Sequence, residues 1–227
     1  MLVRVGIVDS GVAPEQAGAL VASVGIVAHG TAGVARLAAV CDPVGHGTAV
    51  ATLVLEQAPM ARLVSAQAFA KERHAVAACV AEGIDWCLEH EVRVVNLSLG
   101  LTVDHDLLRS ACAAAVARGV IVVAAFPARG GSVYPAAYPG VVAVSGDARC
   151  AAQTWSVIEP ERLYGAAPLA ADGVTSGGAS YAAARMSGHA ARFLAAWPDA
   201  RAEDFRDWLA AGAAFRGRER RQPVTAD

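Results

Sequence analysis

Short runs of β-branched, apolar residues alternate with longer amphipathic stretches along most of this chain. The runs predict strands at 2–8, 23–28, 34–40, 62–67, 93–99, 120–125 and 140–146, and the amphipathic stretches predict helices at 46–57, 75–90, 106–119, 179–197 and 202–211. Successive strands that are joined through a helix run parallel, and the helices then cover the sheet. The pattern therefore predicts an α/β fold of three layers, in which a mostly parallel, twisted sheet carries helices on both faces.

The chain of 227 residues has the length of one α/β domain, and 55% of its residues are apolar, which is enough for a large core. We assign this domain to residues 1–212. The remaining segment, 213–227, is charged and has no helix cap, so we expect a flexible tail. Within the domain, Asp104 is placed to cap the third predicted helix, and Gly119 is placed to end it.

The charge and the apolar runs of the chain exclude several classes of partner. Its 19 basic and 21 acidic residues leave a net charge of −2, which argues against a general binder of nucleic acid or of anionic membranes. No apolar stretch reaches the roughly 18 residues that a membrane helix needs. Met1 is followed directly by a strand pattern rather than by a signal peptide. We therefore expect a cytoplasmic protein that has no membrane partner.

The five cysteines form no CxxC pair; they are Cys41, Cys79, Cys87, Cys112 and Cys150. Because no export signal is visible, we expect reduced thiols in the core. Cys79 and Cys87 lack the clustered histidines or cysteines that would complete four ligands, so we expect no metal site.

Three short stretches each place a reactive side chain where the backbone geometry is special. Asp9 in "GIVDSG" ends an apolar strand at the carboxyl edge of the predicted sheet, although a turn aspartate is the ordinary interpretation. His46 in "GHGTAV" opens an apolar helix, where the helix dipole disfavours imidazolium; a surface histidine beside a loop is the alternative. Ser180 follows a Gly-Gly-Ala turn at the start of a long helix. Three interpretations fit that place: Ser180 is an N-cap serine, or it is a nucleophile whose own N–H faces an oxyanion, or the turn before it binds phosphate.

The order Asp, His, Ser, with the His and the Ser each at the start of a helix, is the chain order of subtilisin. The motifs around these residues resemble those of the subtilisin-like serine proteases over about residues 3–212. "VGIVDSG" and "GHGTAVA" resemble the Asp and His motifs, and "VVNLSLG" resembles the strand VINMSLG. "GVIVVAA" resembles the strand before the oxyanion residue, and "YPAAYPGVVAV" resembles the segment after it. "GGASYAAARMSG" resembles the motif GTSMAAPHVAG. Ordered matches across most of the chain leave chance a poor explanation.

The resemblance implies a role for each of these residues. Ser180 would attack the scissile carbonyl, His46 would take its proton and pass it to the leaving amine, and Asp9 would orient the imidazole. An extended substrate would pair as an added strand with the segment Ser98, Leu99 and Gly100. Asn96 occupies a family position in the same motif, and we interpret it as structural. A peptide or protein substrate is thus the expected partner.

The sequence departs from the family at the residue that should donate to the oxyanion. Aligned on "VVAA", the family continues as AAAGN, whereas this chain continues as "AAFPA". Ala128 stands where the Asn is expected, and Pro127 replaces a Gly. Loss of that donor costs about 10²–10³ in turnover, a value that comes from subtilisin itself. The N–H of Ser180 would remain, and Arg129, Ser132 or a group on the substrate would supply the second donor.

Further departures concern the substrate side and the loops. Val133 lies near the position where the family leaves a Gly at the base of the S1 pocket, and with Pro127 it predicts a shallow pocket for a small P1 residue (Gly, Ala or Ser). Tyr181 is bulky beside the nucleophile and is expected to restrict the leaving-group side. The loop after the His helix has none of the acidic pattern that binds calcium in secreted relatives, so we expect no calcium ion and no cofactor.

A protease that works inside a cell has to spare its host, and we see no pro-segment pattern before Asp9. We therefore predict a serine endopeptidase with one dedicated precursor. It would be similar to proteases that trim leader peptides, such as the one that matures the small subunit of quinohemoprotein amine dehydrogenase. The alternative is a catalytically impaired subtilisin fold that binds peptides. Phosphate or nucleotide binding is disfavoured, because the chain has neither GxxxxGK[ST] nor GxGxxG. The oligomeric state is left open.

Overall fold

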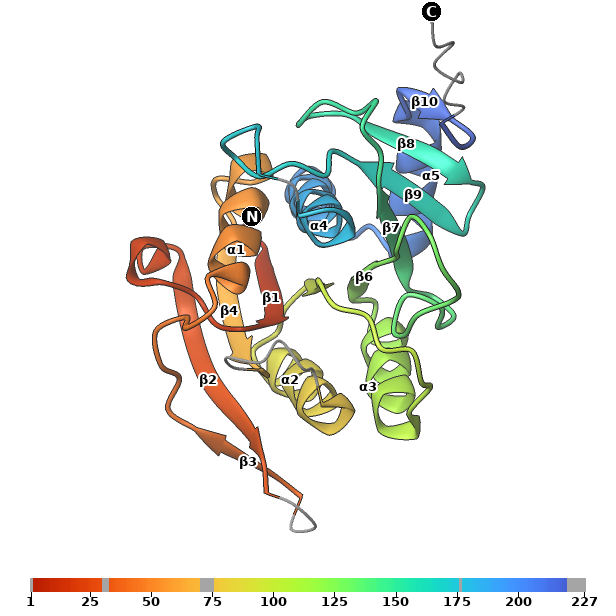
Figure 1. The fold of residues 1–227 in the computed structure, drawn as a ribbon. Coiled ribbons are helices and arrows are strands. Elements are labelled where there is room, and N and C mark those ends of the chain that lie inside the picture. Colours follow the sequence, from red (N-terminus) through yellow and green to blue (C-terminus); the bar gives the residue numbers. More distant parts are fainter. Residues whose placement is uncertain (1, 30–32, 70–75, 176, 220–227) are drawn as a thin grey trace, which may run out of the picture.

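A computed structural model gives the fold of the chain and describes residues 2–29, 33–69, 76–175 and 177–219 (Figure 1). The strands are β1 (Arg4–Asp9), β2 (Leu20–Ala28), β3 (Val34–Leu37), β4 (Arg62–Gln67), β5 (Val94–Leu97), β6 (Ile121–Ala125), β7 (Val142–Gly146), β8 (Trp155–Glu159), β9 (Leu163–Ala166) and β10 (Phe215–Arg216). The helices are the short 3-10 helix η1 (Pro14–Gln16), α1 (His46–Gln57), α2 (Ala77–Glu89), α3 (Asp106–Ala117), α4 (Ala179–Ala196) and α5 (Ala202–Gly212).

The strands form one sheet in the order β10-β8-β9-β7-β6-β5-β1-β4-β2-β3. The pairs β2–β3 and β8–β9 are antiparallel, and the other neighbours are parallel. The central strands β1, β5 and β6 are buried along nearly their whole length, as expected of parallel strands that are covered on both faces. The predicted mostly parallel sheet is confirmed.

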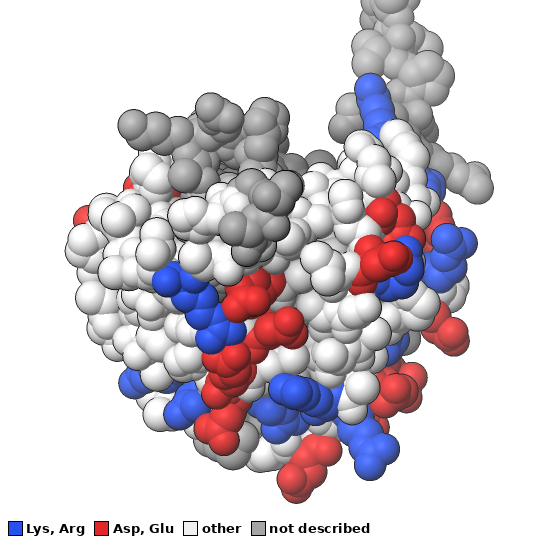
Figure 2. Space-filling model, turned by 90° about the horizontal axis from the view of Figure 1, so that it is seen from below, with Lys and Arg blue, Asp and Glu red and all other residues white. Residues whose placement is uncertain are grey.

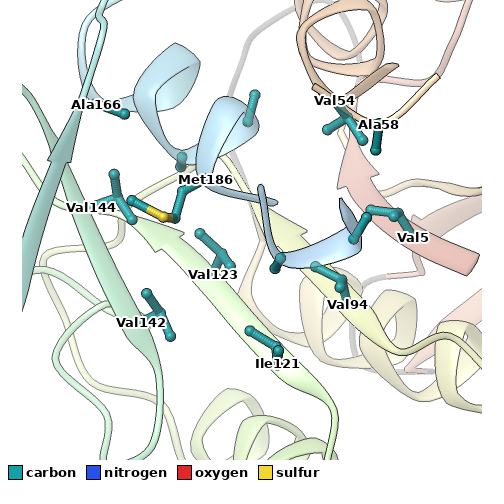
Figure 3. Close-up of a cluster of buried hydrophobic side chains, with 14 of the residues drawn as sticks. Val5, Val54, Ala58, Val94, Ile121, Val123, Val142, Val144, Ala166 and Met186 are labelled. Carbon is teal, nitrogen blue, oxygen red and sulfur yellow. The ribbon is translucent and has the colours of Figure 1, made fainter. Parts of the chain in front are cut away.

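Helices cover both faces of this sheet (Figure 1). The core on one face is built with α1, α4 and α5, and the core on the other face with α2 and α3. On the α4 side, Met186 packs with Val123 of β6 and Val144 of β7 in a continuous layer of aliphatic side chains (Figure 3). Full burial of an aliphatic side chain of this size contributes about 1.5–3 kcal/mol. Such packing on both faces confirms the predicted three layers. It also holds the strands in place, and with them the loops that leave the strand ends.

Two details of the expected fold are corrected. Asp104 does not cap α3, because its carboxylate accepts hydrogen bonds from Arg109 and from the Tyr138 hydroxyl, the latter at 2.8 Å. His105 occupies the N-cap position, and it makes no capping bond with its side chain. Cys41 is exposed and is therefore no core thiol, whereas the other four cysteines are free and buried as expected.

Part of the segment predicted as a flexible tail takes part in the sheet. Phe215–Arg216 forms β10, which runs parallel to β8. Arg149 holds this end of the chain, because its guanidinium lies 5.2 Å from the centre of the Phe215 ring and donates to the carbonyl oxygen of Gly217 at 2.7 Å. Residues 220–227 lie outside the described residues, as does residue 75, where the second predicted helix was expected to begin.

Charged side chains of both signs share the surface. On the face in Figure 2, basic and acidic residues lie interspersed with uncharged ones. Arg36 of β3 is one example, since it pairs with Glu82 at 2.6 Å and with Glu89 at 2.7 Å and so ties the β2–β3 hairpin to α2. None of the helices in the described ranges is long and apolar enough to cross a membrane.

Candidate active site

The carboxyl ends of three neighbouring strands meet at one edge of the sheet. β5 pairs with β1 on one side and with β6 on the other. Asp9 is the last residue of β1, Ser98 follows β5 directly, and Phe126 follows β6 directly. The starts of α1 and α4 reach the same edge, because His46 bonds to Asp9 and Ser180 bonds to Ser98. The edge of a parallel sheet where strands end is the usual place for a site in such folds.

Asp9 and His46 form the central pair of the site. The Asp9 side chain is fully buried, and its Oδ1 lies 2.7 Å from Nδ1 of His46. A carboxylate can only accept a hydrogen bond, so Nδ1 carries the proton in this contact and Nε2 is left as the acceptor of the neutral ring. The N–H of Ser10 also donates to Asp9 Oδ1, at 2.7 Å, and fixes the carboxylate. The structure thus brings together two of the three residues that the sequence analysis singled out.

Asp42, which the sequence analysis did not select, organises the start of α1. Its carboxylate accepts bonds from the N–H groups of Val44, Gly45 and Thr48 at 2.9–3.0 Å, and from the Thr48 hydroxyl at 2.6 Å. Burial alone would raise the pKa of Asp42, but these bonds outweigh burial and hold that pKa below its ordinary value. The carboxylate thereby fixes the turn from which His46 projects.

Ser10 joins the turn of Asp42 to the carboxylate of Asp9. Its hydroxyl donates to Asp42 Oδ1 at 2.9 Å and accepts the N–H of Gly47 at 3.0 Å. The residue at position 47 has to be a glycine, because a Cβ there would lie 2.1 Å from the carbonyl oxygen of Gly11. The helix start is thus pressed against the end of β1, which sets the distance between Asp9 and His46.

Ser180 is the second residue of α4. Gly178 is the N-cap, with φ 58° and ψ −133°, so the interpretation of Ser180 as an N-cap serine is wrong. The N–H groups of the first turn of a helix have no acceptor inside the helix and point out of its end. The Ser180 hydroxyl donates to the carbonyl oxygen of Ser98 at 3.0 Å, and the Ser98 hydroxyl donates to the carbonyl oxygen of Ser180 at 2.8 Å. The third singled-out residue therefore sits directly on the end of β5.

Tyr181 connects the serine segment to the histidine. Its ring stacks beside that of His46, with 6.2 Å between the ring centres. The ring lies over Gly177, where a Cβ would come within 2.2 Å of Tyr181 Cδ2. This glycine makes room for the tyrosine, and the tyrosine forms a wall next to the histidine. Restriction of the leaving-group side by Tyr181 stays a prediction.

The segment after β6, predicted to carry the oxyanion residue, is an exposed loop. Ala128 and Arg129 are both exposed, and Phe126 and Pro127 are partly buried. Residues of this loop and Arg206 of α5 both line a cavity of about 1070 Å³. Neither the triad residues nor Ser98–Gly100 are among the residues that line this cavity, so it is separate from the site around Ser180. Ala128 itself has no side-chain donor that could take the place of the expected Asn.

The predicted substrate segment lies beside the predicted base of the S1 pocket. Leu101 and Tyr134 exchange two backbone hydrogen bonds, of 2.7 and 2.8 Å, which brings Gly100 against Val133. A Cβ built on Gly100 would lie 3.2 Å from Cγ2 of Val133. The Val133 side chain therefore occupies the space next to Gly100, and Leu99 beside it is buried.

The sequence did carry a signal for Asp42. It stands four residues before His46 in "DPVGHG", and an aspartate before a Pro-Val-Gly turn commonly accepts backbone N–H groups two or three residues later. In the described parts of the chain, no group of three or more His, Cys, Asp or Glu side chains is arranged to hold a metal ion.

Comparison with known proteins matches the chain to one family. The pattern of the subtilase family matches residues 3–223. Subtilisin DY of Bacillus licheniformis is 29% identical over 236 residues, which cover 93% of this chain and 83% of subtilisin DY. The minor extracellular protease Epr of Bacillus subtilis is 31% identical over 155 residues, which cover 63% of this chain. The match spans only 23% of Epr and only 32% of a thermostable alkaline protease from Halalkalibacterium halodurans.

Solved structures share the fold at low sequence identity. A cold-adapted subtilisin-like serine proteinase superposes with a TM-score of 0.70 at 21% identity, and the match covers 93% of this chain and 84% of that one. The prenylagaramide maturation protease PagA superposes with a TM-score of 0.67 at 19% identity, and the match covers 92% of this chain and 82% of that one.

Proposed function

The chain belongs to the subtilase family, and we propose that it is a serine endopeptidase that cleaves one dedicated peptide or protein precursor. The observation that carries the proposal is the 2.7 Å bond between Asp9 and His46, with Ser180 at the start of α4 on the same sheet edge. If these residues only stabilised the fold, a buried carboxylate, a histidine held in one tautomer and a serine at a helix start would have no reason to lie at the same sheet edge.

The reaction begins with a rotation of the serine. Ser180 Oγ leaves the carbonyl of Ser98 and donates to Nε2 of His46, which can accept because Nδ1 donates to Asp9. As Oγ bonds to the scissile carbon, its proton passes to His46, and Asp9 stabilises the imidazolium that forms. His46 then protonates the leaving amine as the C–N bond breaks. Water, deprotonated by the same histidine, releases the acid and restores Ser180.

The oxyanion site limits the rate of this reaction. The N–H of Ser180 is the donor that α4 supplies, and Ala128 offers no side-chain donor at the position where the family has Asn. A group of the right precursor, or Arg129 in the neighbouring exposed loop, completes the site. An endopeptidase that depends on its substrate for a donor is slow on other peptides, which agrees with a dedicated precursor.

Two further observations support a narrow substrate. Val133 occupies the space next to Gly100, which leaves room for a small P1 side chain. One of the solved structures of the same fold is a maturation protease, PagA. We propose removal of a leader peptide in the cytoplasm as the corresponding role here, and a similarity to the quinohemoprotein amine dehydrogenase peptidase stays a prediction.

A second candidate function is peptide binding without turnover. It is favoured by Ala128 and by the bond that turns the Ser180 hydroxyl to the carbonyl of Ser98. In that case the site around Ser98–Gly100 would hold an extended peptide and leave it intact.

A fluorophosphonate probe separates the two functions, because it labels a serine only when that serine is activated by its base. We expect the wild-type protein to be labelled, Ser180→Ala to lose the label, and Ser110→Ala, which removes an exposed serine of α3, to keep it. A folded wild-type protein that takes up no label would overturn the protease proposal in favour of the binder. Incubation with peptides encoded near its gene, followed by mass spectrometry, would then identify the precursor and the cleaved bond.

A further inference from the structure

A chain of buried hydrogen bonds runs beneath Ser180 from the middle of α4 to the end of β5. The Ser187 hydroxyl lies 3.0 Å from Oδ1 of Asn96, and Nδ2 of Asn96 donates to the Ser98 hydroxyl at 2.9 Å. The Ser98 hydroxyl in turn donates to the carbonyl oxygen of Ser180 at 2.8 Å. Ser187 and Asn96 are 0% exposed and Ser98 is 4% exposed. Competition from bulk water is therefore absent along the chain.

Each bond in this chain fixes the direction of the next. Because the Ser187 hydroxyl donates to Oδ1, the Asn96 amide has to present its NH₂ group to Ser98. The Ser98 oxygen then accepts, so its own proton is directed to the carbonyl of Ser180. If the amide turned over, its oxygen would face Ser98 and would draw that proton away from Ser180. The Ser187 hydroxyl thus selects the arrangement in which Ser180 is held.

Ser187 is well placed for this task. It lies seven residues after Ser180 on α4, which is close to two helical turns, so both side chains are on one face of the helix. Asn96 is in the central strand β5 between β1 and β6. The Ser187 hydroxyl also lies 2.9 Å from the carbonyl oxygen of Ala183, so its single proton is shared between that carbonyl and Oδ1 of Asn96. The Ala183 carbonyl oxygen already accepts a backbone hydrogen bond within the helix, so it does not depend on the Ser187 hydroxyl. Asn96 Oδ1 does depend on it, because Ser187 is the donor that the described structure gives to that oxygen.

We infer that Ser187 is a positioning residue, which acts through Asn96 and Ser98 to hold the backbone of Ser180, and with it the nucleophile and the N–H that faces the oxyanion. The inference rests on the proposed endopeptidase function. Loss of the Ser187 hydroxyl frees the Asn96 amide to turn over and lets the Ser180 carbonyl lose its donor. We expect the affinity for substrate to stay unchanged, because Ser187 and Asn96 lie outside the predicted substrate segment and only the hydroxyl of Ser98 takes part in these bonds.

The test compares Ser187→Ala with Ser156→Ala, which removes another fully buried serine hydroxyl, one that donates to Asp147 at 2.6 Å and has no part in the bonds that link Ser187 to Ser180. With a fluorophosphonate probe at rising concentration, we expect the limiting rate of labelling to fall about three- to tenfold in Ser187→Ala, the effect of one net hydrogen bond. The concentration of half-saturation should stay unchanged, and Ser156→Ala should label at the wild-type rate. Both substitutions take a hydrogen-bond donor away from a buried acceptor, so both should lower the thermal midpoint, but only Ser187→Ala should lower the labelling rate.

A double-mutant cycle then shows the route. If Ser187 acts through Asn96, Ser187→Ala has no further effect on the labelling rate once Asn96→Ala is present, whereas independent effects would multiply. If the wild-type protein is labelled and Ser187→Ala is labelled at the same rate, the inference is overturned and the proposed function stays intact. Multiplicative effects in the cycle would also overturn it. An unlabelled wild-type protein would instead be the failure of the proposed function.

Discussion

At the scale of single residues, the proposed endopeptidase function makes Ala128 the position that would determine how much of the developing negative charge the protein itself can stabilise. It is exposed in the loop after β6, where the family has an amide side chain, and Pro127 before it stiffens the exit from the strand. A methyl group cannot donate a hydrogen bond. The protein therefore places Asp9, His46 and Ser180 at one sheet edge, whereas the predicted oxyanion position carries no amide, and these two features can be tested separately.

Ala128→Asn supplies the missing donor. If the oxyanion site is otherwise empty, we expect turnover of a generic chromogenic peptide with Ala at P1 to rise at least about tenfold and at most by the factor of about 10²–10³ that such a donor is worth in subtilisin. The measurement is kcat for that peptide.

Ala137→Asn is the matched control, because Ala137 is an exposed alanine on the same cavity but after the cis-proline turn. It should leave kcat unchanged. A folded Ala128→Asn protein with no gain would show that another group already fills the site, or that the side chain points elsewhere.

We predict that Val133 limits the size of the P1 side chain that the site accepts. Val133→Gly removes the side chain that lies against Gly100, and we expect the ratio of kcat/KM for P1 Phe over P1 Ala to rise about tenfold or more, because each methylene accommodated in such a pocket is worth about 1–3 kcal/mol. Val133→Ala should give a smaller rise in the same direction.

Val40→Gly makes the same exchange at an exposed loop valine and should leave the ratio unchanged. A folded Val133→Gly protein that still prefers Ala at P1 would mean that the pocket is closed by another group. Strong wild-type preference for a bulky P1 residue would contradict the shallow pocket directly.

At the scale of elements, the sequence predicts the central layer well. The pattern for 46–57 matches α1 (His46–Gln57), and that for 62–67 matches β4 (Arg62–Gln67), because an unbroken apolar run or a regular helical period dominates in both. β8 and β9 escape prediction because they are short and carry Ser, Glu or Gly among the apolar residues. They form only by pairing with each other and with β7 at the end of the sheet.

Contacts between distant elements explain what the sequence could not show of the site. The order of Asp9, His46 and Ser180 is visible in the motifs, but the bond between Ser187 and Asn96 joins residues 91 positions apart. Nothing in the local pattern of α4 distinguishes Ser187 from a serine that only bonds to its own helix. Likewise, the role of Asp42 depends on Ser10 of another element lying next to it. These residues become visible only after the sheet has brought the elements together.

At the scale of the whole molecule, His189 couples the stability of the fold to pH. It is fully buried in α4, with its ring centre 5.1 Å from that of Trp155 in β8 and its Nδ1 3.3 Å from Arg192. Burial disfavours the charged ring, and Arg192 and Arg185 add repulsion, so the pKa of His189 is lowered from 6.5 to about 3. The folded protein thus holds this histidine neutral at pH values where the unfolded chain takes up a proton.

The free energy of unfolding should therefore depend on pH through His189. Between pH 6.5 and about 3 the unfolded state binds the extra proton, so stability is complete above pH 6.5 and falls as the pH is lowered, with a slope that approaches about 1.4 kcal/mol per pH unit. Urea unfolding between pH 7.5 and 4.5 measures this slope. This pH range lies above the lowered pKa values of Asp42 and Asp147. Protonation of these two carboxylates therefore lowers the stability of the fold only at more acidic pH.

His189→Gln should flatten that slope, even if it lowers stability at every pH, because glutamine does not titrate. His29→Gln, which removes an exposed histidine at the end of β2, should keep the wild-type slope. The raised pKa of Asp85 makes the fold more stable as the pH falls, which is opposite to the effect of His189. Asp85 is present in the wild type and in both variants, so a difference in slope between the wild type and His189→Gln is due to His189. If the slope of His189→Gln equals that of the wild type, the histidine is protonated or hydrated in the folded protein, and the core around Trp155 is more open than the structure shows.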